Sequence, residues 1–205
     1  RQPDPLAASG AGRPAPSGGP FDRAQDRPGV RALDRSSVVP VVSVVGNSGV
    51  GKTTFLEKLV RELKARGYRL ATIKHDVHNF DIDRPGKDSW RLTQAGSDIV
   101  MLSSPRRLAL MEEVEEERTL GQLAAMVEDR VDMVLTEGYR GAAALKIEVS
   151  RRAHSTTLTA PVEDILAIVT DHPFDLDRPQ FDLDAAAAVA DLLEQRFALK
   201  RRQRT

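Results

Sequence analysis

At 205 residues the chain suits one α/β domain with room for terminal tails. Its formal net charge of zero argues against a surface dominated by nucleic-acid binding, and the absence of cysteine excludes disulfides, thiolate metal sites and cysteine nucleophiles. No apolar run approaches the roughly 18 residues that a membrane helix requires, so we expect a cytoplasmic protein with neither nucleic-acid nor membrane partners.

The composition divides the chain into three parts. Residues 1–36 hold six of the twelve prolines and five of the fourteen glycines, which predicts a disordered tail. Residues 37–198 carry the periodic apolar patterns of a folded domain. Residues 199–205 end in the basic run "KRRQRT", which is either a solvated terminus or a docking element for an anionic ligand or acidic partner.

A phosphate-binding loop follows the first predicted strand. The β-branched run at 38–45 is typical of a strand buried on both faces of a parallel sheet. The next residues, "GNSGVGKT", have the spacing G-x-x-x-x-G-K-T, in which backbone N–H groups turn toward phosphate oxygens. Lys52 would reach the β- and γ-phosphates and the Thr53 hydroxyl would bind Mg²⁺. The predicted nucleotide-binding residues here are Gly46, Asn47, Ser48, Gly49, Val50, Gly51, Lys52, Thr53 and Thr54.

A helix and a second strand come next. Apolar residues recur at helical spacing from Phe55 to Leu63, and Gly67 ends the helix. The strand predicted at 69–75 leads into the polar stretch 74–90, on the same sheet edge as the phosphate loop. We expect this stretch to be a nucleotide-responsive loop in which Asp83 or another carboxylate approaches Mg²⁺ through water.

Two other interpretations of this stretch remain. His75 and His78 could suggest a transition-metal site, but a spacing of three in a loop has little geometric meaning. Trp90 is interpreted as packing in the core or at a subunit interface, ahead of stacking on a base or pterin.

The middle of the chain predicts an antiparallel hairpin and a short helix. Strands at 98–103 and 108–111 flank Pro105, and Thr119 with Gln122 forms a capping box before an amphipathic run. Between them the charged segment 112–118 is interpreted as a solvated edge.

The strand predicted at 131–136 offers two acidic candidates for the metal. Asp132 and Glu137 are separated by five residues of strand, roughly 16 Å at about 3.3 Å per residue. Because ligands of open α/β sheets bind at the carboxyl ends of the strands, Glu137 is the candidate and Asp132 is expected to be a solvated strand start. Gly138 would bring a backbone N–H near a γ-phosphate. The predicted metal-side residues are therefore Thr53, Glu137 and Asp83.

Two more strands, at 145–149 and 165–170, precede a final helix with an apolar face from Val189 to Phe197. The alternation predicts an α/β protein, a three-layer P-loop NTPase fold with a mainly parallel sheet and an antiparallel hairpin. Base choice stays open: Asp171, after the last strand, could accept hydrogen bonds from guanine N1 and N2, but the Asn-Lys-x-Asp tetrad of regulatory GTPases is absent.

The motifs in this order resemble a known family. "GNSGVGKTTFLEKLV", "DIDRPGKDS", "VDMVLTEGYR" and "LKIEV" are similar to the molybdopterin-guanine dinucleotide biosynthesis adapter (MobB) family over nearly all of 38–198. The resemblance implies a homodimeric, GTP- and Mg²⁺-binding adapter that assists a MobA-type guanylyltransferase in forming molybdopterin guanine dinucleotide.

The resemblance also implies at most slow GTP hydrolysis, with guanylyl transfer left to the partner. Arg140 and Lys146 could face an anionic pterin phosphate or be solvated strand ends. The rival functions are a small-molecule kinase or ATP-dependent ligase, and a nickel metallochaperone, which the lack of cysteine disfavours.

Overall fold

The structure is a computed structural model that describes residues 39–76 and 83–199. The predicted tail at 1–36, His78 and the basic run from Lys200 lie outside these residues. Within the described ranges, no helix is both long and apolar enough to cross a membrane.

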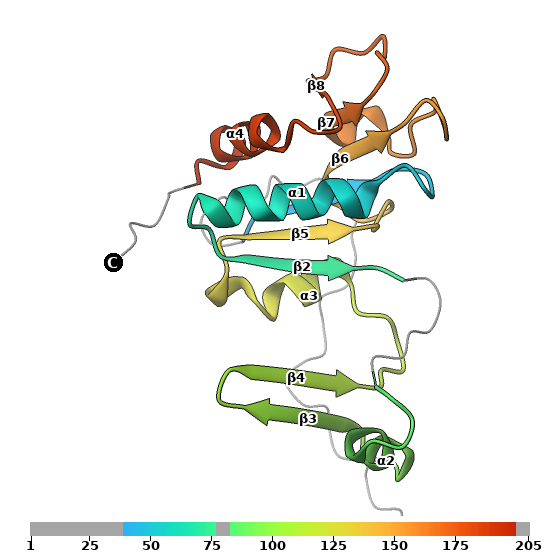
Figure 1. The fold of residues 1–205 in the computed structure, drawn as a ribbon, viewed down its shortest axis with the longest axis vertical. Coiled ribbons are helices and arrows are strands. Elements are labelled where there is room, and N and C mark those ends of the chain that lie inside the picture. Colours follow the sequence, from blue (N-terminus) through green and yellow to red (C-terminus); the bar gives the residue numbers. More distant parts are fainter. Residues whose placement is uncertain (1–38, 77–82, 200–205) are drawn as a thin grey trace, which may run out of the picture. The chain divides into compact units, whose positions relative to one another are not determined.

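A six-stranded sheet in the order β2-β5-β1-β6-β7-β8 forms the centre of the domain (Figure 1). All its neighbouring strands run parallel, so their carboxyl ends share one edge. The strands are β1 (Val41–Val45), β2 (Leu70–Lys74), β5 (Met133–Glu137), β6 (Leu145–Ser150), β7 (Ile165–Thr170) and β8 (Gln180–Phe181).

Two helices cover one face of this sheet. The helix α1 (Lys52–Ala65) lies beside α4 (Ala186–Phe197) (Figure 1), and both bury apolar residues in one cluster with side chains of β1, β5 and β6. The remaining helices are α2 (Asp88–Gln94) and α3 (Leu120–Ala125), and 3₁₀ turns occupy Glu128–Arg130 and Val162–Asp164.

The opposite face of β6 and β7 is covered mainly by connecting chain. Leu158, Ala160, Phe174 and Leu176 pack there in a second apolar cluster with residues of β1 and β7. The segment 151–164 joins β6 to β7 without an α-helix, and we call it the crossover segment.

Three polar side chains of β6 tie the crossover segment to the sheet. Lys146 is fully buried and its Nζ lies 2.9 Å from Asp164 Oδ2. Glu148 is also fully buried and accepts hydrogen bonds from the Thr159 and Ala160 backbone N–H groups at 2.9 and 3.1 Å. Ser150 Oγ donates to the Ser155 carbonyl. Lys146 is therefore neither a solvated strand end nor open to a pterin phosphate, because its ammonium group is held inside the domain.

The two strands β3 (Ile99–Ser104) and β4 (Arg107–Glu112) form the antiparallel hairpin that the sequence predicts. The predicted fold class, a mainly parallel sheet with an added hairpin, is confirmed. The sequence did not predict α2, which begins inside the stretch interpreted as a loop. It also did not predict β8, which has only two residues. Trp90, on α2, is only half-buried and so is not a core residue.

Candidate functional site

The phosphate loop has the strained backbone that its glycines permit. Gly46, Gly49 and Gly51 all have positive φ angles, of 145°, 78° and 98°. A Cβ atom at Gly46 would lie 2.2 Å from the carbonyl oxygen of Val149, so no larger residue fits between the loop and β6. The loop thus sits directly on the carboxyl edge of the sheet, with Gly51 leading into α1.

Lys52 begins α1 and turns back over the loop. Its Nζ donates a hydrogen bond to the Asn47 carbonyl at 2.9 Å. Burial lowers the pKa of Lys52, the Glu137 carboxylate acts to raise it, and the Arg140 guanidinium acts to lower it further. An ammonium group that is partly stripped of water and close to another cation favours an anionic ligand such as phosphate.

Thr53 and Glu137, two of the predicted metal-side residues, are in contact. The Thr53 hydroxyl lies 2.9 and 2.8 Å from the two carboxylate oxygens of Glu137, although 84 residues separate them. This contact follows from the register, which places Glu137 opposite Val44 just before the loop. A hydroxyl and a carboxylate are hard oxygen donors, so this pair fits Mg²⁺ that also binds phosphate oxygens.

Gly138 and Asp83, both predicted to lie near the phosphates or the metal, have hydrogen bonds within the protein. The Gly138 N–H donates to the Val44 carbonyl at 3.0 Å, so approach to a γ-phosphate would require that bond to break. Asp83 Oδ1 instead accepts from Arg84 N–H and the Ser89 hydroxyl, at the start of α2. Across the described ranges, no three His, Asp or Glu side chains gather closely enough to hold a metal ion.

Asp132 is a structural residue rather than a solvated strand start. Its Oδ2 accepts the Arg69 backbone N–H at 2.8 Å, and its side chain is only 16 % exposed. The prediction of a solvated carboxylate was wrong because β2 and β5 begin side by side, which brings the Arg69 N–H to Asp132. Its position at the amino edge of the sheet agrees with the choice of Glu137.

The structure brings further cationic groups to the loop that spacing alone did not reveal. Arg140 Nη2 donates to the Gly46 carbonyl at 2.7 Å. Arg151 is at the start of the crossover segment, and its Nη2 lies 3.5 Å from where a Gly51 Cβ would be. Its buried Nε has no hydrogen-bond partner among the described residues. His154 lies similarly close to Gly49, and Asn47 Nδ2 donates to the Thr157 carbonyl. The crossover segment is thus the second wall of the phosphate loop.

The turn after β5 is strained where it meets β2. Tyr139 has φ of 58°, a left-handed conformation that side chains other than glycine seldom adopt, and its ring lies 4.7 Å from that of His75. His75 Nε2 in turn lies 2.9 Å from Glu117 Oε1. Burial raises the pKa of Tyr139, and the Glu117 carboxylate adds to the effect. His75 therefore belongs to this packing and has no metal-ligand set around it in the part of the chain described.

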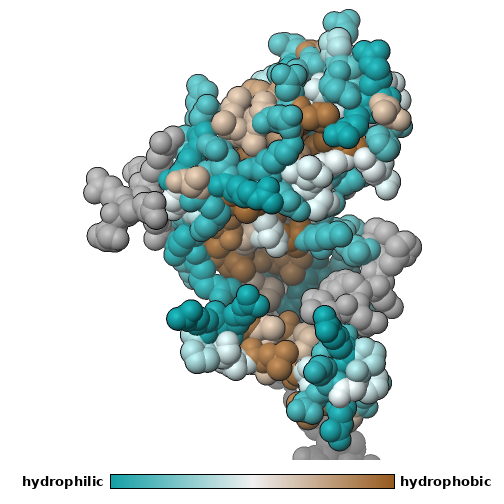
Figure 2. All heavy atoms as spheres, viewed as in Figure 1, coloured by the Kyte–Doolittle hydropathy of each residue, from teal (hydrophilic) through white to brown (hydrophobic). Residues whose placement is uncertain are grey.

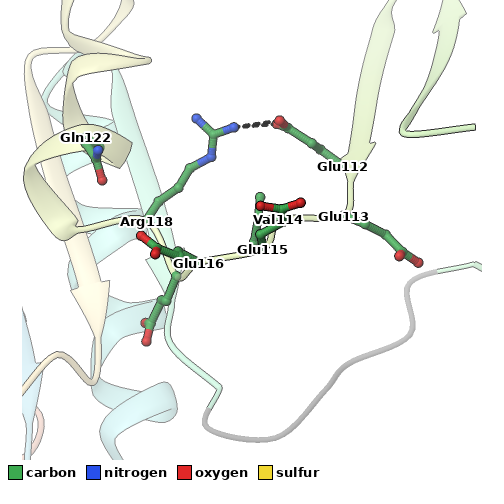
Figure 3. A pocket seen from close by; sticks show the side chains of 8 residues that line it. Glu112, Glu113, Val114, Glu115, Glu116, Arg118 and Gln122 are labelled. Atoms are coloured by element: carbon green, nitrogen blue, oxygen red, sulfur yellow. Dashed lines mark hydrogen bonds and ion pairs between the residues drawn. The ribbon is translucent and has the colours of Figure 1, made fainter. Parts of the chain in front are cut away.

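The acidic segment before α3 forms a shallow depression of about 370 Å³ (Figure 3). Arg118 bridges to Glu112 at 2.7 Å, and the carboxylates of Glu113 and Glu116 point in different directions. The carboxylates do not converge, which agrees with the interpretation of this segment as a solvated edge.

A phosphate loop between a buried strand and a helix, with a hydroxyl and a carboxylate paired at the carboxyl edge of a parallel sheet, defines a P-loop NTPase. A family model described as "Molybdopterin guanine dinucleotide synthesis protein B" (MobB) matches residues 41–171. The chain belongs to the MobB family, which places it in the synthesis of molybdopterin guanine dinucleotide.

Related proteins agree with this assignment. The chain is 39% identical over 165 residues to the molybdopterin-guanine dinucleotide biosynthesis adapter protein of Haemophilus influenzae, covering 80% of this chain and 93% of that protein. It is 35% identical over 162 residues to the Escherichia coli protein of the same name, covering 77% and 93%. The crystal structure of Bacillus subtilis MobB has a TM-score of 0.62 at 27% identity and covers 80% of this chain and 99% of that one.

Proposed function

We propose that the chain is a GTP-binding adapter that assists a MobA-type guanylyltransferase in forming molybdopterin guanine dinucleotide. The observation that carries the proposal is the contact of Thr53 with Glu137 beside the Lys52 ammonium group, since these parts are those needed to hold a nucleoside triphosphate with Mg²⁺. The adapter role is supported by the names of the relatives. GTP hydrolysis is at most slow, and guanylyl transfer belongs to the partner.

The test is an association assay with the purified guanylyltransferase. The two proteins should co-purify in the presence of GTP and molybdopterin, with this chain stimulating guanine dinucleotide formation. Lys52→Ala should lose the GTP-dependent part of this association. No association under any of these conditions, together with unchanged product formation, would contradict the adapter role.

Magnesium dependence tests the metal side of the site. Thr53→Ala should remove most of the strengthening of GTP binding by Mg²⁺, about tenfold, because the hydroxyl ligand is lost. Thr53→Ser keeps a hydroxyl and should keep the effect. Calorimetric titration of GTP with Mg²⁺ and with EDTA measures it. An equal Mg²⁺ enhancement in Thr53→Ala and the unmodified protein would refute the assignment of Thr53.

Arg151 should contribute to binding of the phosphates. Arg151→Ala is expected to weaken GTP binding about tenfold and GMP binding less, since a guanidinium over the loop acts on the phosphate chain. Arg152 is the matched control because it is an exposed arginine next in sequence. If Arg152→Ala weakens GTP binding as much, the effect is one of general charge and the contact is not specific.

We propose that a second copy of the chain packs on the hairpin and forms a homodimer. One face of the hairpin exposes Ile99, Met101, Leu108 and Leu110, each 46 to 61 % accessible, and Figure 2 shows apolar side chains at the hairpin surface. A two-stranded hairpin is marginal alone, so such a face is expected to be covered. The exposed apolar face supports the family expectation of a homodimer.

Disrupting this face should yield monomers. Met101 and Leu110 are directly opposite, so Met101→Lys with Leu110→Glu keeps a favourable cross-strand pair while removing apolar surface. Light scattering after size exclusion should give a dimer for the unmodified protein and a monomer for the double variant. Val162→Lys, at an exposed site elsewhere, should stay dimeric. A dimeric double variant would place the interface elsewhere.

A further inference from the structure

A second depression lies at the carboxyl end of β7. It has a volume of about 330 Å³ and is lined by Thr170, Asp171, His172, Pro173, Gln180, Phe181 and Asp182. Its two carboxylates are accompanied by no lysine or arginine among these lining residues. The depression therefore suits a ligand edge that donates hydrogen bonds, and it disfavours phosphate.

The depression is joined to the phosphate loop by a short chain of contacts. Asp171 Oδ1 accepts the Arg152 backbone N–H at 2.7 Å, and the neighbouring Arg151 lies against Gly51. In the sheet order, β7 is two strands from β1, or about 10 Å. One nucleotide can span this distance, with phosphates on the cationic loop and base at β7.

Asp171 is held ready as an acceptor. The Arg152 N–H and the His172 ring lower the pKa of Asp171, so it is a carboxylate at neutral pH. Its side chain keeps 39 % exposure despite these two bonds. The carboxylate is fixed in orientation and still accessible to a ligand.

His172 supports the carboxylate through one defined tautomer. Its Nδ1 lies 3.0 Å from Asp171 Oδ1 and 3.1 Å from Thr170 Oγ1, whose own hydrogen is donated to the His172 carbonyl. Nδ1 must therefore carry the proton in the neutral ring. Its Nε2 is then a buried acceptor, and this atom has no hydrogen-bond partner within residues 39–76 and 83–199.

We propose that this depression binds the 2-amino-4-oxopyrimidine edge of a ligand, with Asp171 accepting from the ring N–H and the exocyclic amino group. This edge offers two adjacent donors, whereas the corresponding edge of adenine offers a single donor beside an acceptor. Guanine and pterins both have it. The inference rests on the proposed function, in which a guanine nucleotide and a pterin are both bound.

Nucleotide analogues test the guanine source. The unmodified protein should bind GTP about tenfold or more tightly than ITP, which lacks only the 2-amino group. In Asp171→Asn the ratio of GTP affinity to ITP affinity should fall to near one. Asp175→Asn is the matched control, because Asp175 is an exposed carboxylate close in sequence that is not among the residues lining the depression. ATP binding, which depends on Lys52 but not on this edge, should be equal in all three proteins and so reports that the site is folded.

Pterins test the other source. Pterin has an amino group at position 2 where lumazine has an oxo group, so the ratio of their affinities measures recognition of that amino group. If Asp171→Asn loses the preference for pterin over lumazine but keeps the preference for GTP over ITP, the depression binds a pterin. The proposal is overturned if Asp171→Asn leaves both preferences unchanged, or if Asp175→Asn removes them equally. Failure of the proposed function is distinguishable from failure of this inference. If the loop does not bind phosphates, Lys52→Ala will leave both GTP and ATP binding unchanged.

Discussion

Replacing Lys52 by alanine is expected to weaken GTP binding about a hundredfold or more, since a charged hydrogen bond and the charge attraction to two phosphates are lost together. Within the described part of the chain the ammonium group has one hydrogen bond, to the Asn47 carbonyl, and phosphate oxygens would complete its donors. The expected loss is in affinity and not in folding.

Calorimetry with Mg²⁺ and GTP measures the effect, and circular dichroism reports the fold. Lys58→Ala is the control, because Lys58 lies on the same helix but pairs with Asp184. It should leave GTP binding within about twofold. GTP affinity that survives in Lys52→Ala would show that this loop is not the phosphate site.

Replacing Glu148 by alanine is expected to destabilise the domain by about 3 kcal/mol and also to weaken GTP binding. The carboxylate is fully buried and accepts from the Thr159 hydroxyl as well as from two backbone N–H groups. Its removal leaves those N–H groups unpaired and releases the segment that carries Arg151, beside the phosphate loop.

Urea unfolding and GTP titration on the same samples measure both effects. Glu148→Gln keeps one carbonyl acceptor and should fall between the alanine variant and the unmodified protein. Glu163→Ala, an exposed change in the same segment, should alter neither quantity by more than about 0.5 kcal/mol. Full stability in Glu148→Ala would contradict the structural role assigned to its hydrogen bonds.

The sequence predicted well those parts of the fold that depend on local pattern. The buried run before Gly46 and the amphipathic run after Lys52 have clear periods, and β7 has the bounds that its apolar run predicts. The first strand begins at Val41 rather than Val38, directly after Pro40, which has no N–H to donate. Glu137 was correctly placed at the edge because parallel strands share one direction.

The parts that the sequence did not reveal depend on long-range contacts. Lys146 and Glu148 have the polar character of a solvated strand face, and only the chain that returns over β6 gives them buried partners. Arg151 is likewise one arginine among many until the strand order places β6 beside β1. Spacing along the chain has no information about which strand is a neighbour, so these roles required the structure.

The hydrogen bonds that hold the crossover segment to β6 also allow its motion to be followed by amide hydrogen exchange. The amide hydrogens of Thr159 and Ala160 are bonded to the Glu148 carboxylate and not to a backbone carbonyl. Their exchange with deuterated solvent therefore requires the segment to lift from β6. The exchange rates of these two amides measure how often the wall of the phosphate loop opens, and a nucleotide that bridges Lys52 and Arg151 should slow them.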